Sequence, residues 1–303
     1  MLDDKDKIIF ENLLHDCRIS TTKLAKLTRL TQPTVYYRIK QLEAQGYVDK
    51  YDIILNYTLL STPTHFYFIH IPEKEKDTFE TYCKSNKKVI ALLSLIHKRN
   101  YEVMTMMQDN EAKVFETYLQ RREYAFIKYT IEDLDIMPYS LFDVNVKDAK
   151  PVKKQQIPLD SKDIKILKEL MDGGARTPLL EVAKKTKLTW DIVQYRFKRM
   201  KNSGLIAMFI AQPGMKRFAV QNDILVIEAN IDFEYMKKKI NILGKFPYLC
   251  KIGEHIYITQ LLSTTFEEYK KTLYALHQTL GEDLTKIEIY NTQKTIFGNR
   301  YDF

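Results

Sequence analysis

Glycine and cysteine are both scarce in this sequence. Nine of its 303 residues are glycine, and Gly46 is the only glycine in residues 1–150. The GxSxG, GxGxxG and P-loop motifs of hydrolases and nucleotide-binding enzymes do not occur. The three cysteines (Cys17, Cys83 and Cys250) are odd in number and far apart, and no CxxC pair is present. We interpret them as reduced, mostly structural thiols of a cytoplasmic protein.

Long apolar runs and metal-binding patterns are also absent from the sequence. The longest largely apolar run, Val89–Ile96, is far too short to cross a bilayer. The chain opens on Leu2 and Asp3 without the basic leader and apolar stretch of a signal peptide. The six histidines show neither HExxH nor another paired-ligand spacing. We therefore expect no membrane segment, no secretion, no metal and no cofactor.

The positive charge of the chain is concentrated in two blocks. Residues 18–50 hold seven basic and two acidic side chains, and residues 176–209 hold eight basic and two acidic ones. The blocks therefore carry +5 and +6, although the whole chain carries only +8, so the remainder is negative. Charge that only keeps a protein soluble would not separate by sign in this way. The pattern is typical of a nucleic-acid-binding protein.

The two basic blocks are copies of one sequence. Their correspondence runs without a gap from Ala25 and Ala183 to Gly46 and Gly204, so that each residue matches the one 158 positions later. A repeat of this length indicates two copies of one domain pair in the chain. Whatever one copy does, we expect the chain to do in duplicate.

Each copy carries the start and stop signals of three short helices. Ser20 and Thr31 occupy N-cap positions, Pro33 falls in the first turn of the third helix, and Gly46 ends that helix. Residues 47–57 then predict two short strands forming a hairpin, which would complete a winged helix-turn-helix. The apolar stripe of the third helix is Val35, Ile39 and Leu42 in the first copy, and Val193, Phe197 and Met200 in the second.

After each basic block the pattern changes to βαββαβ, the ferredoxin-like order. The expected strands are 65–71, 89–96, 101–107 and 129–136 in the first half, and 224–231, 248–252, 256–262 and 286–290 in the second. The predicted fold class is α+β, with two winged helix-turn-helix units, each followed by a ferredoxin-like module. The predicted domains are 1–58 and 159–212 (winged helix-turn-helix units), 59–143 and 213–303 (sensing and dimerisation modules), and 144–158 (linker).

These features together resemble the Lrp/AsnC family of archaeal and bacterial transcription regulators. The resemblance is carried by Leu2-Asp3-x-x-Asp6-x-x-Ile9, by Arg18-Ile19-Ser20-x-x-x-Leu24-Ala25, and by the run from Leu30-Thr31 to Gly46. The same marks reappear in the second half, with Thr177 for the serine and Met200 for the leucine. It implies that the helix-turn-helix units bind double-stranded DNA, and that the βαββαβ modules dimerise and bind an amino acid as a small-molecule effector. Family members ordinarily contain one such unit, so the tandem form is a departure.

The family's effector loop usually carries a glycine and an acidic residue between two strands. Gly253 and Glu254 stand at about that place in the second half and are the candidate effector-binding residues. The first half has His97-Lys98-Arg99-Asn100 instead, and a loop without glycine cannot easily present backbone N–H groups to a small anion. We therefore do not expect an effector site in the first half.

The outward face of each third helix is the predicted DNA-binding surface. An exposed helix with hydrogen-bonding side chains in its N-terminal half can enter the major groove and read base edges. Exposed tyrosines there favour DNA contact over a merely solvated face. The candidate DNA-binding residues are Thr31, Gln32, Pro33, Thr34, Tyr36, Tyr37, Lys40 and Gln41, and Thr189, Trp190, Asp191, Gln194, Tyr195, Lys198 and Arg199.

Particular roles are expected for some of these residues. Lys40 and Lys198 should contact phosphate rather than bases, because phosphates take most contacts. Gln194 can pair with adenine, and Arg199 would favour guanine if it reaches a base. Asp191 would repel phosphate unless it accepts from a cytosine amino group. We interpret the side chain of Trp190 as a core wedge in preference to a stacking surface.

Arg38 and Arg196 lie beside the buried stripe of the third helix, not opposite it. Asp6 and Asp163 recur at corresponding positions of the first helix. We therefore predict a salt bridge between the first and third helices in each copy, rather than contacts from these arginines to bases.

The sequence predicts a sequence-specific DNA-binding transcription regulator with two non-identical reading heads, and not an enzyme. We expect its two βαββαβ modules to pair as an intramolecular pseudo-dimer, with further homodimerisation left open. One alternative is a siroheme-decarboxylase-like tetrapyrrole enzyme, for which His97, Arg99 and Asn100-Tyr101 offer the family's residue types in a scrambled order. Another alternative is an interaction scaffold that does not bind DNA.

Overall fold

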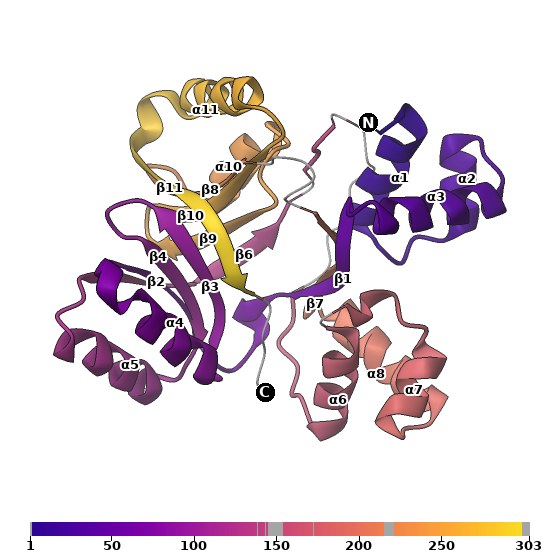
Figure 1. Ribbon diagram of the computed structural model, residues 1–303, viewed down its shortest axis with the longest axis horizontal. Coiled ribbons are helices and arrows are strands. Elements are labelled where there is room, and N and C mark those ends of the chain that lie inside the picture. Colours follow the sequence, from indigo (N-terminus) through magenta and orange to yellow (C-terminus); the bar gives the residue numbers. More distant parts are fainter. Residues whose placement is uncertain are drawn as a thin grey trace. The chain divides into compact units, whose positions relative to one another are not determined.

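The computed structural model describes residues 2–137, 139–142, 144, 154–171, 173–214 and 221–298. The chain divides into two compact units (Figure 1). Unit 1 comprises residues 1–59 with 138–220, and unit 2 comprises residues 60–137 with 221–303. Each unit therefore takes one segment from each half of the chain, so the corresponding parts of the repeat lie within the same unit.

Unit 1 contains both copies of the helix-turn-helix. The side chains of Ser20, Thr31 and Thr189 each accept a hydrogen bond from the backbone N–H three residues further on, which confirms Ser20 and Thr31 as N-caps. Gly46 and Gly204 follow the third helices with φ of +72° and +79°, a conformation that glycine adopts without steric cost. The helices are α1 (Asp4–His15), α2 (Thr21–Thr28), α3 (Gln32–Ala44), α6 (Ser161–Leu170), η3 (Gly174–Arg176), α7 (Leu179–Thr186) and α8 (Trp190–Asn202).

The predicted apolar stripe of the third helix is buried in both copies. It packs on the other two helices of its own copy, which fixes the direction in which the rest of the helix faces. The buried residues are Val35, Ile39 and Leu42 on α3, and Val193, Phe197 and Met200 on α8.

The predicted hairpin after each third helix is wrong. The first copy extends a single strand, β1 (Val48–Leu55), and the second copy extends β7 (Ile206–Pro213). These two strands pair antiparallel with each other. Residues 47–57 contain neither glycine nor proline to form a tight turn, so the chain continues and takes its partner from the other copy. The two copies therefore share one two-stranded ribbon.

Unit 2 contains two βαββαβ modules with the predicted order of elements. In each module two helices cover one face of the sheet, and the cores form between them, around Tyr67 and Phe115 in module 1 and around Tyr257 and Leu276 in module 2. Module 1 comprises β2 (Thr64–Ile69), α4 (Lys76–Ser85), β3 (Val89–Ile96), β4 (Tyr101–Met106), α5 (Asp109–Arg121) and β5 (Phe126–Thr130). Module 2 comprises β8 (Gln221–Ala229), α10 (Phe233–Asn241), β9 (Tyr248–Gly253), β10 (Ile256–Ser263), α11 (Phe266–Leu280) and β11 (Leu284–Phe297). The remaining 3-10 turns are η1 (Tyr57–Leu59), η2 (Glu73–Glu75) and η4 (Gly281–Asp283).

The strands of both modules join in one nine-stranded sheet of order β5-β2-β4-β3-β11-β8-β10-β9-β6. The prediction of a single strand over 129–136 is wrong, because two strands lie there. The first is β5, which pairs with β2, and the second is β6 (Asp133–Ile136), which pairs with β9 of module 2. The strand predicted over 286–290 is longer than expected, because β11 continues to Phe297 along β3 of module 1. Both differences arise from pairing between modules, which the periodicity of one segment cannot show.

The predicted linker, 144–158, lies for the most part outside the described residues. Its end, from residue 154, is described and runs without helix or strand into α6. In the part of the chain that the structure describes, none of the helices is long and apolar enough to cross a membrane.

Candidate nucleic-acid interface

Helix α3 presents its predicted outward face to solvent. Tyr36 and Tyr37 are 58% and 63% exposed. Gln32 and Pro33 are exposed as well, and Thr34 is half-buried. The N-terminal half of the helix thus combines aromatic rings with hydrogen-bonding groups, which are the side chains that can reach base edges in a groove.

The C-terminal half of α3 is nearly neutral, whereas that of α8 is not. Lys40 Nζ lies 2.7 Å from Glu43 Oε2, and this hydrogen bond raises the pKa of Lys40. In α8 the place of Glu43 is taken by Lys201, and no carboxylate of the described residues lies within ion-pair distance of Lys198. The charge of Lys40 is therefore neutralised locally, and the charge of Lys198 remains available. Gln41 accepts a hydrogen bond from the Gln45 side chain.

The outward face of α8 differs from that of α3 at its N-terminal end. Tyr195 is 67% exposed, Asp191 is exposed, and Gln194 is half-buried. Trp190 is 44% exposed, so its interpretation as a core wedge is wrong. It is the first residue of the helix, and the buried stripe begins only at Val193. An exposed indole at this place is a surface on which a partner can stack.

The arginines beside the buried stripe hold the helices together. Arg38 Nη1 lies 2.7 Å from Asp6 Oδ1, and Arg196 Nη1 lies 2.9 Å from Asp163 Oδ2. The predicted salt bridge between the first and third helices is therefore confirmed in both copies. The backbone N–H of Asp163, followed by the side chain of Arg196, lowers the pKa of Asp160 to about 2.

Arg199 belongs to the same cluster as Arg196. Its Nη2 donates to Asp163 Oδ2 at 2.6 Å and to the backbone carbonyl of Pro158 at 3.1 Å. The guanidinium therefore turns toward the start of α6, and in this structure it does not project outward toward a base.

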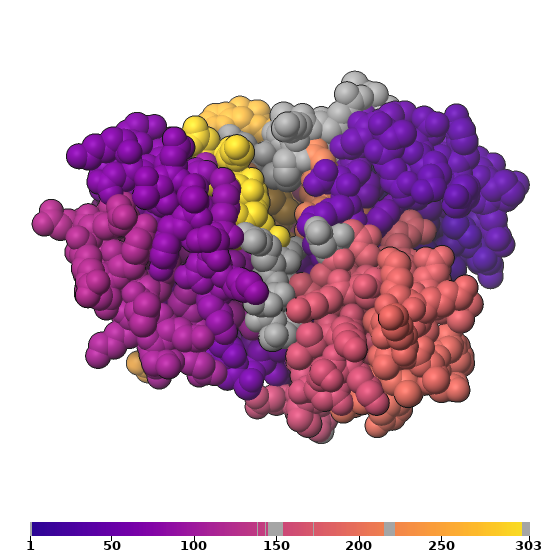
Figure 2. All heavy atoms as spheres, turned by 60° about the horizontal axis from the view of Figure 1, so that its bottom comes forward, coloured from indigo at the N-terminus to yellow at the C-terminus, as the bar shows by residue number. Residues whose placement is uncertain are grey.

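Across the ribbon, each copy places an arginine over an aromatic ring of the other copy. Arg18 Cζ lies 5.1 Å from the ring centroid of Phe209, and Arg176 Cζ lies 5.0 Å from that of Tyr51. These pairs are related by the same 158-residue offset as the repeat, so the two contacts are reciprocal. Arg18 Nη2 also donates to the Thr177 carbonyl at 2.7 Å. In Figure 2 the first copy, in indigo, is in direct contact with the second, in salmon.

Sequence reasoning missed this contact, because Arg18 and Arg176 were counted with the surface charge of the basic blocks. Both are half-buried between the copies. The sequence did contain a signal, because each copy has an arginine and an aromatic residue at corresponding positions. These are Arg18 and Tyr51 in the first copy and Arg176 and Phe209 in the second. Recurrence alone does not show that each arginine reaches the ring of the opposite copy.

Comparison with known proteins agrees with the duplicated helix-turn-helix. Residues 2–49 match a model described as winged helix-turn-helix DNA-binding, and residues 159–201 match the AsnC-type helix-turn-helix domain. The chain is 24% identical over 153 residues to an uncharacterised HTH-type transcriptional regulator of Pyrococcus furiosus, which covers 50% of this chain and 90% of that protein. It is 39% identical over 56 residues to the regulator LrpA of Pyrococcus horikoshii, 18% of this chain and 40% of LrpA. The chain therefore carries a duplicated helix-turn-helix that is similar to that of Lrp/AsnC-family regulators.

The chain shares its fold over nearly its whole length with the crystal structure of the siroheme decarboxylase NirDL. The TM-score is 0.63, and the alignment covers 99% of this chain and 94% of the other. The sequences are only 11% identical, so the likeness concerns the fold alone.

Two of the four residues that suggested a tetrapyrrole enzyme, His97 and Arg99, meet at one carboxylate, and the other two bond elsewhere. His97 Nε2 and Arg99 Nη1 lie 3.6 and 3.2 Å from Glu288 Oε1 on β11. Asn100 instead exchanges two hydrogen bonds of 2.8 Å with the backbone just beyond β2. The Tyr101 hydroxyl donates to Glu80 Oε1 on α4 at 2.8 Å. Two of the four residues thus brace the module.

The candidate effector residues receive no support from backbone geometry. Gly253 is not among the residues of positive φ, and a Cβ there would make ordinary contacts of 3.5 Å with Ile256. Nothing in its conformation therefore calls for glycine. Glu254 is exposed in the turn that follows. Binding of an amino acid at Gly253 and Glu254 stays a prediction.

Proposed function

We propose that this protein is a sequence-specific, double-stranded-DNA-binding transcription regulator whose single chain carries two non-identical reading heads. The observation that carries the proposal is the junction of the two copies in unit 1. Helices α3 and α8 keep their outward faces exposed, while the β1–β7 ribbon and the reciprocal arginine contacts join their copies. A single-unit family member needs a second chain to bring two such helices together.

The electrostatics of the exposed surface support DNA as the partner. The basic blocks carry +5 and +6, and the negative remainder belongs to the other segments. Arg38, Arg196, Arg18 and Arg176 are used within the fold, so the reading surface depends on lysines and on neutral polar and aromatic side chains. Lysine ammonium groups interact with phosphate as point charges and carry no sequence information, whereas amide and aromatic groups can discriminate bases.

The chain acts, in this proposal, as an intramolecular pseudo-dimer. Support comes from unit 2, where β11 of module 2 pairs with β3 of module 1, while β6, which follows module 1, pairs with β9 of module 2. A covalent link between the halves gives them a high effective concentration for each other. Further dimerisation through outer surfaces would turn the complete DNA site into a palindrome of asymmetric halves.

A tetrapyrrole enzyme is the second candidate, and the cluster of His97, Arg99 and Glu288 is the observation that favours it. Since Asn100 and Tyr101 brace the fold, the DNA proposal accounts for more of the chain, including the exposed tyrosines. We expect the visible spectrum of an added tetrapyrrole to be unchanged by the purified protein. A shifted absorption band that disappears in His97→Ala would favour the enzyme.

Salt-dependent DNA binding is the direct test of the proposal. Each phosphate contact releases counterions, so the logarithm of affinity should fall with the logarithm of salt, by about 0.9 per contact. Fluorescence anisotropy with labelled duplexes should show this fall for all sequences. Lys198→Ala should weaken binding to every duplex more than Lys40→Ala does, because Lys40 is already paired with Glu43.

Lys113→Ala is the matched control, since Lys113 is an exposed lysine of α5 in unit 2. It should leave affinity and salt dependence unchanged. A DNA affinity that does not change with salt concentration would contradict the proposal. A complete absence of DNA binding at low salt would favour the interaction scaffold.

A further inference from the structure

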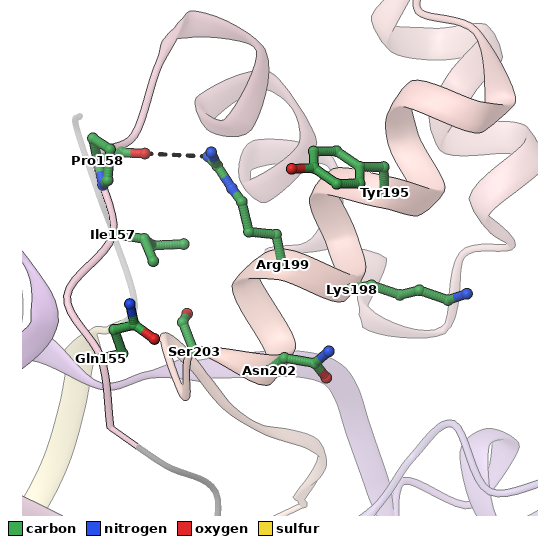
Figure 3. A pocket seen from close by; sticks show the side chains of 8 residues that line it. All are labelled: Gln155, Ile157, Pro158, Tyr195, Lys198, Arg199, Asn202 and Ser203. Carbon is green, nitrogen blue, oxygen red and sulfur yellow. Dashed lines mark hydrogen bonds between the residues drawn. The ribbon is translucent and has the colours of Figure 1, made fainter.

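A groove runs along α8 in the second helix-turn-helix copy, between that helix and the chain segment that precedes α6. Its volume is about 530 Å³, and Figure 3 shows its lining side chains, with Tyr195 and Arg199 directed into the space beside Ile157 and Pro158. The residues that line the groove are Gln155, Ile157, Pro158, Tyr195, Lys198, Arg199, Asn202 and Ser203.

The segment that forms one wall of the groove is fixed to α8 at two points. The backbone N–H of Gln155 donates to the Ser203 carbonyl at 2.9 Å. Arg199 Nη2 donates to the Pro158 carbonyl at 3.1 Å, as the dashed line in Figure 3 marks. The wall is therefore attached to the same helix that carries Tyr195 and Lys198, and the groove belongs to the reading surface of this copy.

The groove has the chemistry of an oxyanion site. Its lining includes an ammonium group, a guanidinium group, two side-chain amides and a phenol, and no aspartate or glutamate. The carboxylate nearest to Arg199, Asp163, is fully buried and shared with Arg196. A ligand with several acceptor oxygens and negative charge would be complementary to this set of donors.

The first copy lacks this chemistry at the corresponding positions. Gln41 replaces Arg199, Ala44 replaces Asn202, and Glu43 replaces Lys201. Between positions 40 and 44 the first copy is neutral, because Lys40 and Glu43 cancel, whereas the corresponding positions of the second copy carry +3. The two copies therefore differ in the charge of one corresponding helical turn, the last turn of α3 and of α8.

We propose that this groove seats a backbone phosphate of the bound duplex, so that the second head, which also reads bases, anchors the DNA backbone at a place where the first head does not. The inference rests on the proposed function and goes beyond it by giving the two heads different tasks. Phosphate contacts set register and position, and base contacts set sequence preference. The second head has the +3 turn that such a phosphate contact needs, and the corresponding turn of the first head is neutral.

Exchange of the two turns between the heads tests the assignment. Arg199→Gln with Lys201→Glu gives the second copy the residues of the first, and Gln41→Arg with Glu43→Lys does the reverse. The first pair should flatten the log–log salt slope by about 2 and weaken binding tenfold or more at moderate salt. The reverse pair should add affinity without restoring what the first pair removes, because residues 155–158, which form one wall of the groove, are attached to the second copy.

Lys201→Glu alone serves as a second variant, since Arg199 also braces α6 and its loss could destabilise the fold. This variant leaves Arg199 in place. Its introduced carboxylate should pair with Lys198, as Glu43 pairs with Lys40, and should flatten the log–log salt slope by about 1. Thermal unfolding of each variant shows whether a change in DNA affinity reflects folding. If the wild type binds DNA with the expected salt dependence and Lys201→Glu leaves the slope unchanged, the groove assignment fails while the proposed function stands.

Titration with inorganic phosphate separates a DNA phosphate from a free anion. We expect millimolar phosphate to produce only small shifts in the NMR signal of the Asn202 side-chain amide, and a short duplex to produce large ones. Tight binding of free phosphate, combined with a salt slope for DNA that Lys201→Glu does not alter, would identify the groove as an anion sensor and overturn the anchoring role. Failure of the wild type to bind any duplex would overturn both proposals.

Discussion

At the residue scale, Glu102 is the side chain of unit 2 whose burial has the clearest consequence. Its neighbours on β4, Tyr101 and Val103, belong to the core beneath the helices, so Glu102 points to the other face of the sheet. It is 4% exposed, and burial raises its pKa to about 8. A buried carboxyl group in such surroundings is more stable with its proton than without it.

Glu102 should therefore make the protein less stable as pH rises from about 5 to about 8. In this window the folded state keeps a proton that the unfolded state, with its ordinary pKa of 4.5, has released. The free energy of unfolding should fall by up to about 1.4 kcal/mol per pH unit. Urea unfolding of Glu102→Gln should show a flatter pH profile and higher stability at alkaline pH. Glu267→Gln, at an exposed position of α11, is the control, and parallel profiles for wild type and Glu102→Gln would contradict the prediction.

Residues whose roles depend on near neighbours could be predicted from the sequence, and residues with distant partners could not. Ser20 and Thr31 cap their helices as expected, because a cap bonds to backbone only three residues away. Trp190 was assigned to the core from its residue type, although it stands before the buried stripe begins. Arg199 meets Asp163 and Pro158, 36 and 41 positions earlier in the chain, and the periodicity of α8 contains no information about them.

At the scale of elements, the sequence predicted that strands exist but not always which strands they pair with. The order of helices and strands in both modules follows from periodicity and turn residues. The partner of β1 does not, because an edge strand accepts any strand of suitable length and register. The same applies to β6 and to the end of β11, which pair across the modules. The missing information concerns contacts between repeats, which are distant in sequence.

Arg18 and Arg176 should stabilise the junction that β1 and β7 form. Each places its guanidinium over a ring of the opposite copy, and such contacts contribute about 0.5–2 kcal/mol when partly desolvated. Arg18→Ala should cost more than Arg176→Ala, because it also leaves the Thr177 carbonyl without its donor at 2.7 Å. Urea unfolding of the full chain measures both effects, with Lys26→Ala on the exposed face of α2 as the control. Arginine variants as stable as the control would show that the rings contribute nothing to the junction.

At the scale of the whole molecule, the two copies share a scaffold and differ on the exposed face of the third helix. The threonine N-caps of the third helices, the buried stripes and the arginine–aspartate bridges recur in both copies. The exposed positions of the third helices have diverged. Pro33 corresponds to Asp191, Tyr36 to Gln194 and Gln41 to Arg199. A homodimer cannot diverge in this way, since both of its heads come from one gene product, and a tandem chain can.

The two heads should therefore prefer different half-sites. Gln194 is able to make a bidentate contact with adenine that Tyr36 cannot make, and one good contact of this kind is worth about 1–3 kcal/mol of discrimination. That difference is large enough to be visible in a selected site. The substitution Gln194→Ala should relax base preference in one half-site only, whereas Tyr36→Ala should affect only the other.

Selection of bound duplexes from a random pool tests the central claim most directly. The account predicts enrichment of a site whose two halves differ, with the preference of one half lost when selection is repeated with Gln194→Ala. A simple palindrome that this substitution leaves unchanged, or a pool that is not enriched at all, would contradict the claim that one chain carries two unlike DNA-reading heads.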